Sequence, residues 1–379
     1  MESLTEKKGI FYKKFTDVPF TGKVDGKEKG VMRDGKRDGS WITHGSSGQE
    51  HSKGNYNNGL KEGSWVSYHY NGELSSKGEF KNGKKEGSWI NYCSRGQIKF
   101  KGEFKNGKQD GFWVSYHDNG KLSSQSEIKN GKKEGIWVTY DNKGKLFSKN
   151  EYKNGKKVGY WEDHWKNGNL KYKGNYKNGK MEGSWEGYWK NGQLNYKGEN
   201  QKGKQDGIWV EYWKNGQLKY KGEFKNGIKE GKWVEYLYNG KIWNEGIYLN
   251  GIKEGFWIER HGENNIAIIE TNYKSGLKEG SHVVRIENGQ LWEKGDYKNG
   301  KGEGSWVGYL DNGQLRYKGD YKNGKEEGSW VRYWENGKLF YKGDYKNGKR
   351  EGSWVSYNRN GTVDKGWTGT FKDGKKISD

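Results

Sequence analysis

The chain has 379 residues, of which only 29% are hydrophobic, and it contains 63 glycines, 20 tryptophans, 27 tyrosines, 12 phenylalanines and one proline. Such a chain cannot fill a thick aliphatic core, yet it is too aromatic for ordinary disorder, so many shallow aromatic contacts must order it. The single cysteine, Cys93, excludes an intrachain disulfide framework, and a net charge of +21 favours either an anionic partner or lysines that solubilise turns and strand edges.

The first 19 residues, which begin MESLTEKKGIFYKKF, form a lead-in to the periodic sequence. This segment has no apolar run of signal-peptide length, and no stretch of the chain approaches the roughly 20 apolar residues that span a bilayer. We therefore expect a soluble, cytoplasmic protein, and secretion by a route without a cleavable signal stays open.

From residue 20 onward, tryptophan recurs every 24 residues. After ten tryptophans one extra residue intervenes, His282 takes the next place, and three tryptophans resume the period. A fixed period of about 20 to 50 residues indicates an array built from one supersecondary motif. The period divides the chain into a repeat array at 20–256, a divergent repeat at 257–281, and a continuation with a C-terminal cap at 282–379. The expected structural ladder comprises Trp41, Trp65, Trp89, Trp113, Trp137, Trp161, Trp185, Trp209, Trp233, Trp257, Trp306, Trp330 and Trp354.

The unit that starts at Trp209 reads WVEYWKNGQLKYKGEFKNGIKEG, two short alternating runs separated by Asn-Gly steps. Asn-Gly supplies the positive φ angles of a type I′ turn, whose twist matches that of paired strands, so each unit is predicted to be a β-hairpin. The predicted fold is an all-β, single-layer, twisted antiparallel meander of about 14 tandem β-hairpin repeats, elongated and solenoid-like.

A two-residue turn at Asn215-Gly216 would fix the register of the two strands around it. The resulting cross-strand pairs are Trp213 with Leu218, Glu211 with Tyr220, and Trp209 with Gly222. The last pair is favourable because a large indole can lie over a strand glycine that has no side chain of its own.

The residues that could carry chemistry do not converge. His69 and His117 occupy equivalent places two units apart, roughly 19 Å from each other across four strands, and that place resembles a tolerant surface position. An acid precedes the second glycine in thirteen of fourteen units, Val158 being the exception, and its expected task is to accept hydrogen bonds in the turn. We predict no catalytic residue, no metal site and no cofactor, and hence no enzyme.

Positions two and four residues after the ladder tryptophan vary most between units and share the tryptophan's face. This face is the predicted contact surface, with tolerant drift as the alternative, and its candidate residues are Trp165, Trp189, Trp213, Trp334 and Arg332.

The least regular unit, WIERHGENNIAIIETNYKSGLKEGSH at 257–282, loses the Asn-Gly turn and carries the most aliphatic run of the chain. These changes predict a bulge or bend with an exposed apolar spot that docks a partner or a second copy, with decay of one repeat as the alternative. The candidate residues here are Arg260, His261, Ile266, Ile268, Ile269 and His282.

The unit GxWvxYxxNGqLxYKGeYkNGkkeG resembles the MORN-type repeat, in the variant found in the YwqK-like antitoxin family. The resemblance extends from FTGKVDGKEKGVMRDGKRDGSW (20–41) to WTGTFKDGKK (367–376). It implies an array of antiparallel hairpins that serves protein contact, scaffolding or, in some proteins, association with membrane phospholipid. The antitoxin label implies that the partner is a toxin neutralised by binding.

The sequence therefore predicts a non-enzymatic repeat protein that binds another macromolecule, first of all a protein, with an antitoxin or immunity role implied by the resemblance. One alternative is a basic and aromatic binder of anionic lipid, polysaccharide or, less readily, nucleic acid. Another is a passive scaffold or self-associating structural protein.

Overall fold

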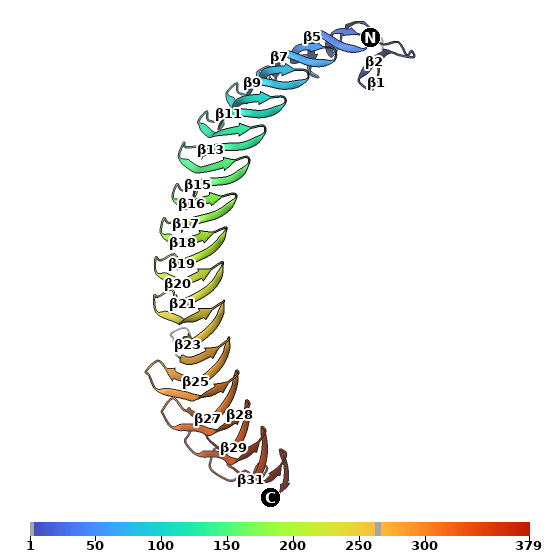
Figure 1. Cartoon of the computed structure of the whole chain (residues 1–379). Helices are drawn as coiled ribbons and strands as arrows, with labels where there is room; N and C mark the ends of the chain where they lie inside the picture. Colours follow the sequence, from blue (N-terminus) through green and yellow to red (C-terminus); the bar gives the residue numbers. More distant parts are fainter. Residues whose placement is uncertain (1–3, 262–266) are drawn as a thin grey trace. The chain divides into compact units, whose positions relative to one another are not determined.

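The computed structural model describes residues 4–261 and 267–379. The chain divides into two compact units, unit 1 at Met1–Gly192 and unit 2 at Gln193–Asp379. Every element in the described ranges is a β-strand, which confirms the predicted all-β class (Figure 1). None of the described residues forms a helix that could cross a membrane.

Unit 1 contains β1 (Leu4–Lys7), β2 (Ile10–Lys13), β3 (Gly22–Val24), β4 (Glu28–Arg33), β5 (Lys36–His44), β6 (Glu50–Asn57), β7 (Leu60–Tyr68), β8 (Leu74–Lys81), β9 (Lys84–Tyr92), β10 (Ile98–Lys105), β11 (Lys108–Tyr116), β12 (Leu122–Lys129), β13 (Lys132–Tyr140), β14 (Leu146–Lys153), β15 (Lys156–His164), β16 (Leu170–Lys177) and β17 (Lys180–Tyr188). The lead-in strands β1 and β2 form a sheet of their own.

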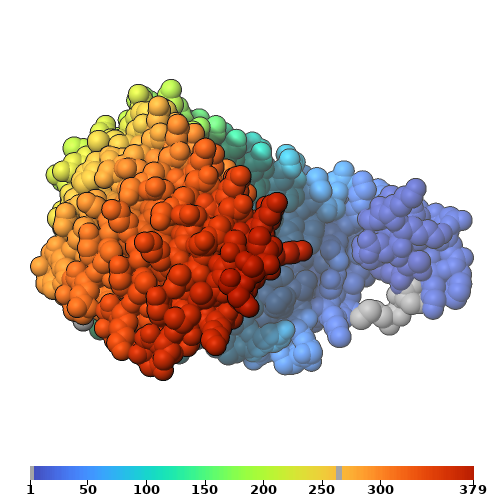
Figure 2. Space-filling model, turned by 90° about the horizontal axis from the view of Figure 1, so that it is seen from below, coloured from blue at the N-terminus to red at the C-terminus, as the bar shows by residue number. Residues whose placement is uncertain are grey.

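Unit 2 contains β18 (Leu194–Gln201), β19 (Lys204–Tyr212), β20 (Leu218–Lys225), β21 (Ile228–Tyr236), β22 (Ile242–Leu249), β23 (Ile252–His261), β24 (Ala267–Lys274), β25 (Leu277–Ile286), β26 (Leu291–Lys298), β27 (Lys301–Tyr309), β28 (Leu315–Lys322), β29 (Lys325–Tyr333), β30 (Leu339–Lys346), β31 (Lys349–Ser356), β32 (Gly369–Lys372) and β33 (Lys375–Ser378). The short strands β32 and β33 close its C-terminal end, which faces the viewer in Figure 2.

Within each unit the paired strands are antiparallel neighbours in sequence, for example β19 with β20 and β20 with β21, so the predicted meander of tandem hairpins is confirmed. The second turn of the repeat, which is Asn-Gly in most repeats, forms the predicted type I′ turn. Asn226 and Gly227 have φ angles of 53° and 84°, and Lys225 lies directly opposite Ile228. This turn is called the I′ turn below.

The other Asn-Gly step does not form a two-residue turn, and the predicted register is wrong at this point. The Gly216 N–H donates to the Trp213 carbonyl at 2.9 Å and the Trp213 N–H donates to the Gln217 carbonyl at 2.8 Å. Only Gly216, at φ 85°, is left-handed, which is the geometry of a three-residue loop closed by a glycine bulge. The bulge absorbs one residue, so Tyr212 rather than Trp213 faces Leu218.

Further from the loop the predicted register is confirmed, because Glu211 faces Tyr220 and Trp209 faces Gly222. The indole, however, covers a different glycine from the predicted one. The space above Gly222 is filled by Trp233 of the next repeat, while Trp209 covers Gly198 on β18. Each ladder tryptophan therefore leans onto the strand that precedes it, and this contact joins consecutive repeats.

The tryptophan ladder is the core of each unit. Twelve of its thirteen indoles are buried, with 1–6% of their surface exposed, and Trp137, whose covered position carries Ser126 instead of glycine, is half-buried. Between most of the indoles lie Tyr or Phe rings in edge-to-face contact, as Phe224 does at 6.3 Å from Trp209 and 5.0 Å from Trp233, and buried Ile128 and Asn200 take this place in two repeats. A single sheet thus acquires a dry aromatic core without a second layer.

Candidate binding surfaces

The edge that carries the I′ turns is held together by the recurring acid and by the backbone. The Glu230 carboxylate accepts the Asn250 N–H at 2.7 Å, and the Gly251 N–H donates to the Lys229 carbonyl at 2.8 Å. The predicted turn hydrogen bond therefore forms, but it reaches the turn of the following repeat. These carboxylates are structural acceptors in a row along the edge.

Some of the lysines that give the chain its charge are also bound within the structure. Lys229 Nζ lies 4.1 Å from the centre of the Trp233 ring, and Lys85 Nζ lies at the same distance from Trp89. Burial lowers the pKa of Lys85 and of Lys61, because the charged ammonium loses water over the aromatic row. This lysine position therefore stabilises the ladder, and the exposed charge comes from the other lysines.

The opposite edge carries the three-residue loops and four of the predicted contact tryptophans. Each of three indoles donates its N–H to the backbone of the next repeat, at 3.0 Å from Trp165, 3.2 Å from Trp213 and 3.0 Å from Trp334. His69 Nε2 and His117 Nε2 each lie 3.0 Å from a carbonyl of the next repeat, so in these two repeats the place is half-buried and hydrogen-bonded, although Cys93 and Leu237 occupy it elsewhere. Trp189 is half-buried as well. Where an indole or imidazole with one of these bonds stands here, the position ties neighbouring loops together.

The divergent repeat shows a compensated exchange in its core. Thr271 stands at the covered-glycine position and His282 at the ladder position; both are buried, and the Thr271 hydroxyl lies 2.6 Å from His282 Nδ1. Thr271 is larger than the usual glycine, and the imidazole of His282 is smaller than the usual indole, so the two exchanges compensate each other in volume. Burial lowers the pKa of His282 to about 4, with a further contribution from Lys278, so the imidazole is neutral near pH 7.

Where the structure describes it, the aliphatic run of this repeat is not the exposed apolar spot that we predicted, and the register shift between β24 and β25, at Thr271 and Tyr273, recurs at the same place in other repeats. Strands β23 and β24 pair without a register shift, and Ile268 and Ile269 are half-buried. Arg260 is half-buried 3.7 Å from Glu245, and His261 is exposed at the end of β23. Ile266 lies outside the described residues.

An exposed apolar patch lies elsewhere in unit 2, on the I′-turn edge. Ile228, Leu249, Ile252 and Leu277 are each about half exposed, at 48–51%, and we call these four residues the turn-edge patch. They flank three successive turns at places where most repeats carry lysine. Ile252 Cγ2 lies 2.7 Å from the space that a Cβ on Gly276 would take, so the side chains follow one another along the edge.

The sequence prediction missed this patch, although a signal for it exists. Aligning the repeats on their I′ turns shows lysine replaced by isoleucine or leucine three times in succession, whereas the single replacement at Leu60 is isolated. Exposed lysines flank the patch along the edge, at Lys204 and Lys225 on one side and Lys298 and Lys301 on the other.

No group of three or more His, Cys, Asp or Glu side chains that could hold a metal ion occurs in the parts of the chain that the structure describes. The acids of the I′-turn edge are held in backbone hydrogen bonds, as at Glu254, which accepts the Ser275 N–H at 2.7 Å. Ligand binding by the described residues would therefore use a surface patch or a cleft.

Ten segments of the chain match the family described as the MORN repeat variant. The matched residues are 61–82, 109–130, 133–154, 157–178, 181–199, 205–226, 229–250, 278–299, 302–323 and 326–347. These matches cover more than half of the chain, which therefore belongs to the MORN repeat variant family. Repeats of this family are in general binding and scaffold repeats.

No curated protein matches the chain. Among solved structures, it is similar to TcdB2-TccC3 without its hypervariable C-terminal region (11% identity, TM-score 0.15, 89% of this chain and 19% of that one). It is also similar to the TcdB2-TccC3-Cdc42 structure (12% identity, TM-score 0.13, with the same coverage). The chain thus spans about a fifth of the length of these proteins, and at such TM-scores the likeness carries no argument about fold or function.

Proposed function

We propose that the chain binds a protein partner and that the turn-edge patch of unit 2 is the centre of the contact. The observation that carries this proposal is the row of four half-exposed aliphatic side chains in place of lysines. Apolar patches with a polar rim mark protein contact sites.

The charge around the patch favours one kind of occupant. The flanking lysines and the net charge of +21 disfavour a second copy of the chain, which would bring like charges together. They favour a protein whose contact surface is apolar at its centre and acidic at its rim. The narrower proposal, that this partner is a toxin neutralised by binding, is supported by the family resemblance alone.

The proposal is tested by capture from a lysate of the source cells at low and high salt, followed by affinity measurement with the purified partner. The triple variant Ile228→Lys, Ile252→Lys, Leu277→Lys restores the lysines of the other repeats and is expected to abolish binding. The control Leu60→Lys makes the same change at an isolated turn of unit 1, where Leu60 is 50% exposed, and should bind as the wild type does.

Two outcomes would contradict the proposal. If the triple variant binds the captured protein as well as the wild type, the patch is not the contact. If moderate salt abolishes every interaction whatever the ligand, the chain is an electrostatic binder of anionic lipid, polysaccharide or nucleic acid.

A further inference from the structure

Not every three-residue loop of unit 2 is tied to the next loop by the same pair of side chains. In at least five repeats two side chains tie a three-residue loop to the next one, as Trp334 does to the Tyr357 carbonyl and Asn336 to the Arg359 carbonyl. The loop after β27 lacks both ties, as do the loops after β21 and β25, where Leu237 and Ile286 stand at the donor position. Leu310 replaces the indole or imidazole donor, and Asn312 Nδ2 donates to Gln314 Oε1 of its own loop at 3.2 Å.

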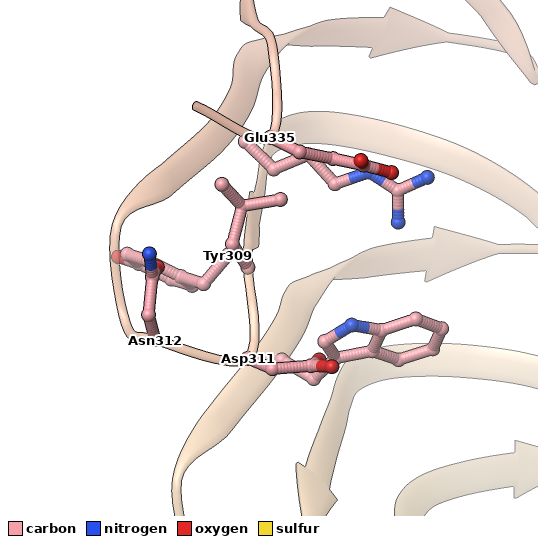
Figure 3. A pocket seen from close by; sticks show the side chains of 7 residues that line it. Tyr309, Asp311, Asn312 and Glu335 are labelled. Carbon is pink, nitrogen blue, oxygen red and sulfur yellow. The ribbon is translucent and has the colours of Figure 1, made fainter. Parts of the chain in front are cut away.

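At the loop after β27 lies a cleft made of two adjoining cavities, which we call the inter-repeat cleft. The larger cavity measures about 450 Å³ and the smaller about 230 Å³, and both are lined by Leu310, Arg316 and Glu335. In Figure 3, which shows the larger cavity, Asp311 and Glu335 point to the same side from the two successive loops. Such a volume holds a small ligand.

Three side chains that line the cleft are unpartnered. Arg316 and Arg332 are half-buried, yet within the described ranges neither guanidinium has a hydrogen bond or an ion pair. Trp292, with 37% of its surface exposed, has neither a ring contact nor a hydrogen bond to any described residue. No donor atom of these three side chains is both buried and unsatisfied, so water reaches them in the free chain, and their convergence on one cleft offers a ligand two guanidinium groups and an indole that no protein group occupies.

The charges in the cleft restrict the chemistry of that ligand. Arginine occurs at only nine positions in a chain rich in lysine, and its planar fork matches a carboxylate. The Glu335 carboxylate is paired with Arg359 at 2.8 Å, whereas Asp311 is exposed and available to accept hydrogen bonds from hydroxyl groups. A doubly charged phosphate would be repelled by Asp311, while a singly charged ring with several hydroxyls suits this set of groups.

We propose that the inter-repeat cleft binds a sugar acid, a pyranose ring that carries one carboxylate. The carboxylate pairs with Arg316 and Arg332, the ring's C–H face stacks on the Trp292 indole, and the hydroxyls hydrogen-bond to Asp311 and Asn312. This site is separate from the turn-edge patch, which lies on the I′-turn edge.

Ligand-observed NMR titration of the full chain with digalacturonate tests the proposal, with neutral cellobiose and AMP as the comparison ligands. Saturable binding of digalacturonate is expected, with a Kd on the order of 1 mM for so small a ligand, together with weaker binding of the other two. No saturable binding of digalacturonate, equal binding of cellobiose, or tighter binding of AMP would each overturn the proposal.

Substitutions of residues that line the inter-repeat cleft test whether the ligand binds there. Arg316→Gln and Trp292→Ala are each expected to weaken digalacturonate binding about tenfold or more, and Arg316→Lys should recover part of the loss because it keeps the charge. The matched control is Trp243→Ala, which removes an indole of similar exposure, 44%, at the equivalent position of another repeat, and it should leave the affinity unchanged.

If Trp243→Ala weakens binding as much as Trp292→Ala does, the ligand stacks on exposed tryptophans in general and the cleft is not its site. The turn-edge triple variant should also bind digalacturonate normally, so failure here and failure of the proposed function are distinguishable.

Discussion

At the scale of single residues, the fold depends on a close fit between an indole and a residue without a side chain. Trp233 fills the space above Gly222 and is fixed there by Phe224 at 5.0 Å and Tyr248 at 6.0 Å. The ring has rings on both sides, so it cannot move aside. The glycine is required by this contact, because its backbone is in an ordinary strand conformation.

We therefore expect Gly222→Ala to lower the free energy of unfolding by about 1 to 3 kcal/mol, since the added methyl group overlaps the Trp233 ring. Gly302→Ala is the matched control, because its methyl group would meet only ordinary contacts, the nearest being Tyr321 at 3.4 Å. That change should be neutral or slightly stabilising through the unfolded state. Equal effects of the two changes in urea denaturation would contradict this account.

The buried His282 predicts a pH dependence with a defined sign. Its pKa is about 4 in the folded chain and near 6.5 in the unfolded chain, so the unfolded state binds more protons between these values. Its contribution to stability is complete above pH 6.5 and is lost as the pH falls from 6.5 to 4. Urea denaturation at several pH values should show this slope in the wild type. The double variant Thr271→Gly, His282→Trp restores the common pair and should lack that slope; the same slope in both proteins would be inconsistent with this role of His282.

At the scale of elements, how much was predictable depends on whether the deciding contact lies within one hairpin or between repeats. The hairpins follow from the Asn-Gly steps and the alternation, but both steps have the same dipeptide. The three-residue loop is bound to the next repeat, because Trp213 Nε1 donates to the Tyr236 carbonyl and Asn215 Nδ2 donates to the Tyr238 carbonyl, and the dipeptide does not encode these contacts. The turn-edge patch and the inter-repeat cleft depend on residues about 24 positions apart and so require the stacking of repeats to be known.

The hydrogen bonds between successive I′ turns lead to a testable prediction. The Glu230 carboxylate accepts the Asn250 N–H at 2.7 Å, so Glu230→Val should raise the amide-exchange rate of Asn250 about fivefold or more, the equivalent of a hydrogen bond worth about 1 kcal/mol. The chain contains its own control, because Val158 stands at the acid's position in its repeat and the Asn178 N–H has no acceptor within the described residues. Asn178 should therefore exchange fast already in the wild type. Slow exchange at Asn178 would show that the acid is not what protects the turn.

At the scale of the whole molecule, the described strands of each unit pair with their neighbours in sequence, so damage should stay local. Trp233 contacts residues on β20, β21 and β22 through Gly222, Lys229 and Tyr248. We expect Trp233→Ala, a loss of about 3 to 5 kcal/mol, to remove amide-exchange protection in these strands while β27 to β31 and the strands of unit 1 stay protected. Lys232→Ala, at the preceding exposed position of β21, is the control and should change little. Uniform loss of protection along the chain after Trp233→Ala would mean that the repeats unfold as one cooperative body and that the ladder transmits stability beyond nearest neighbours.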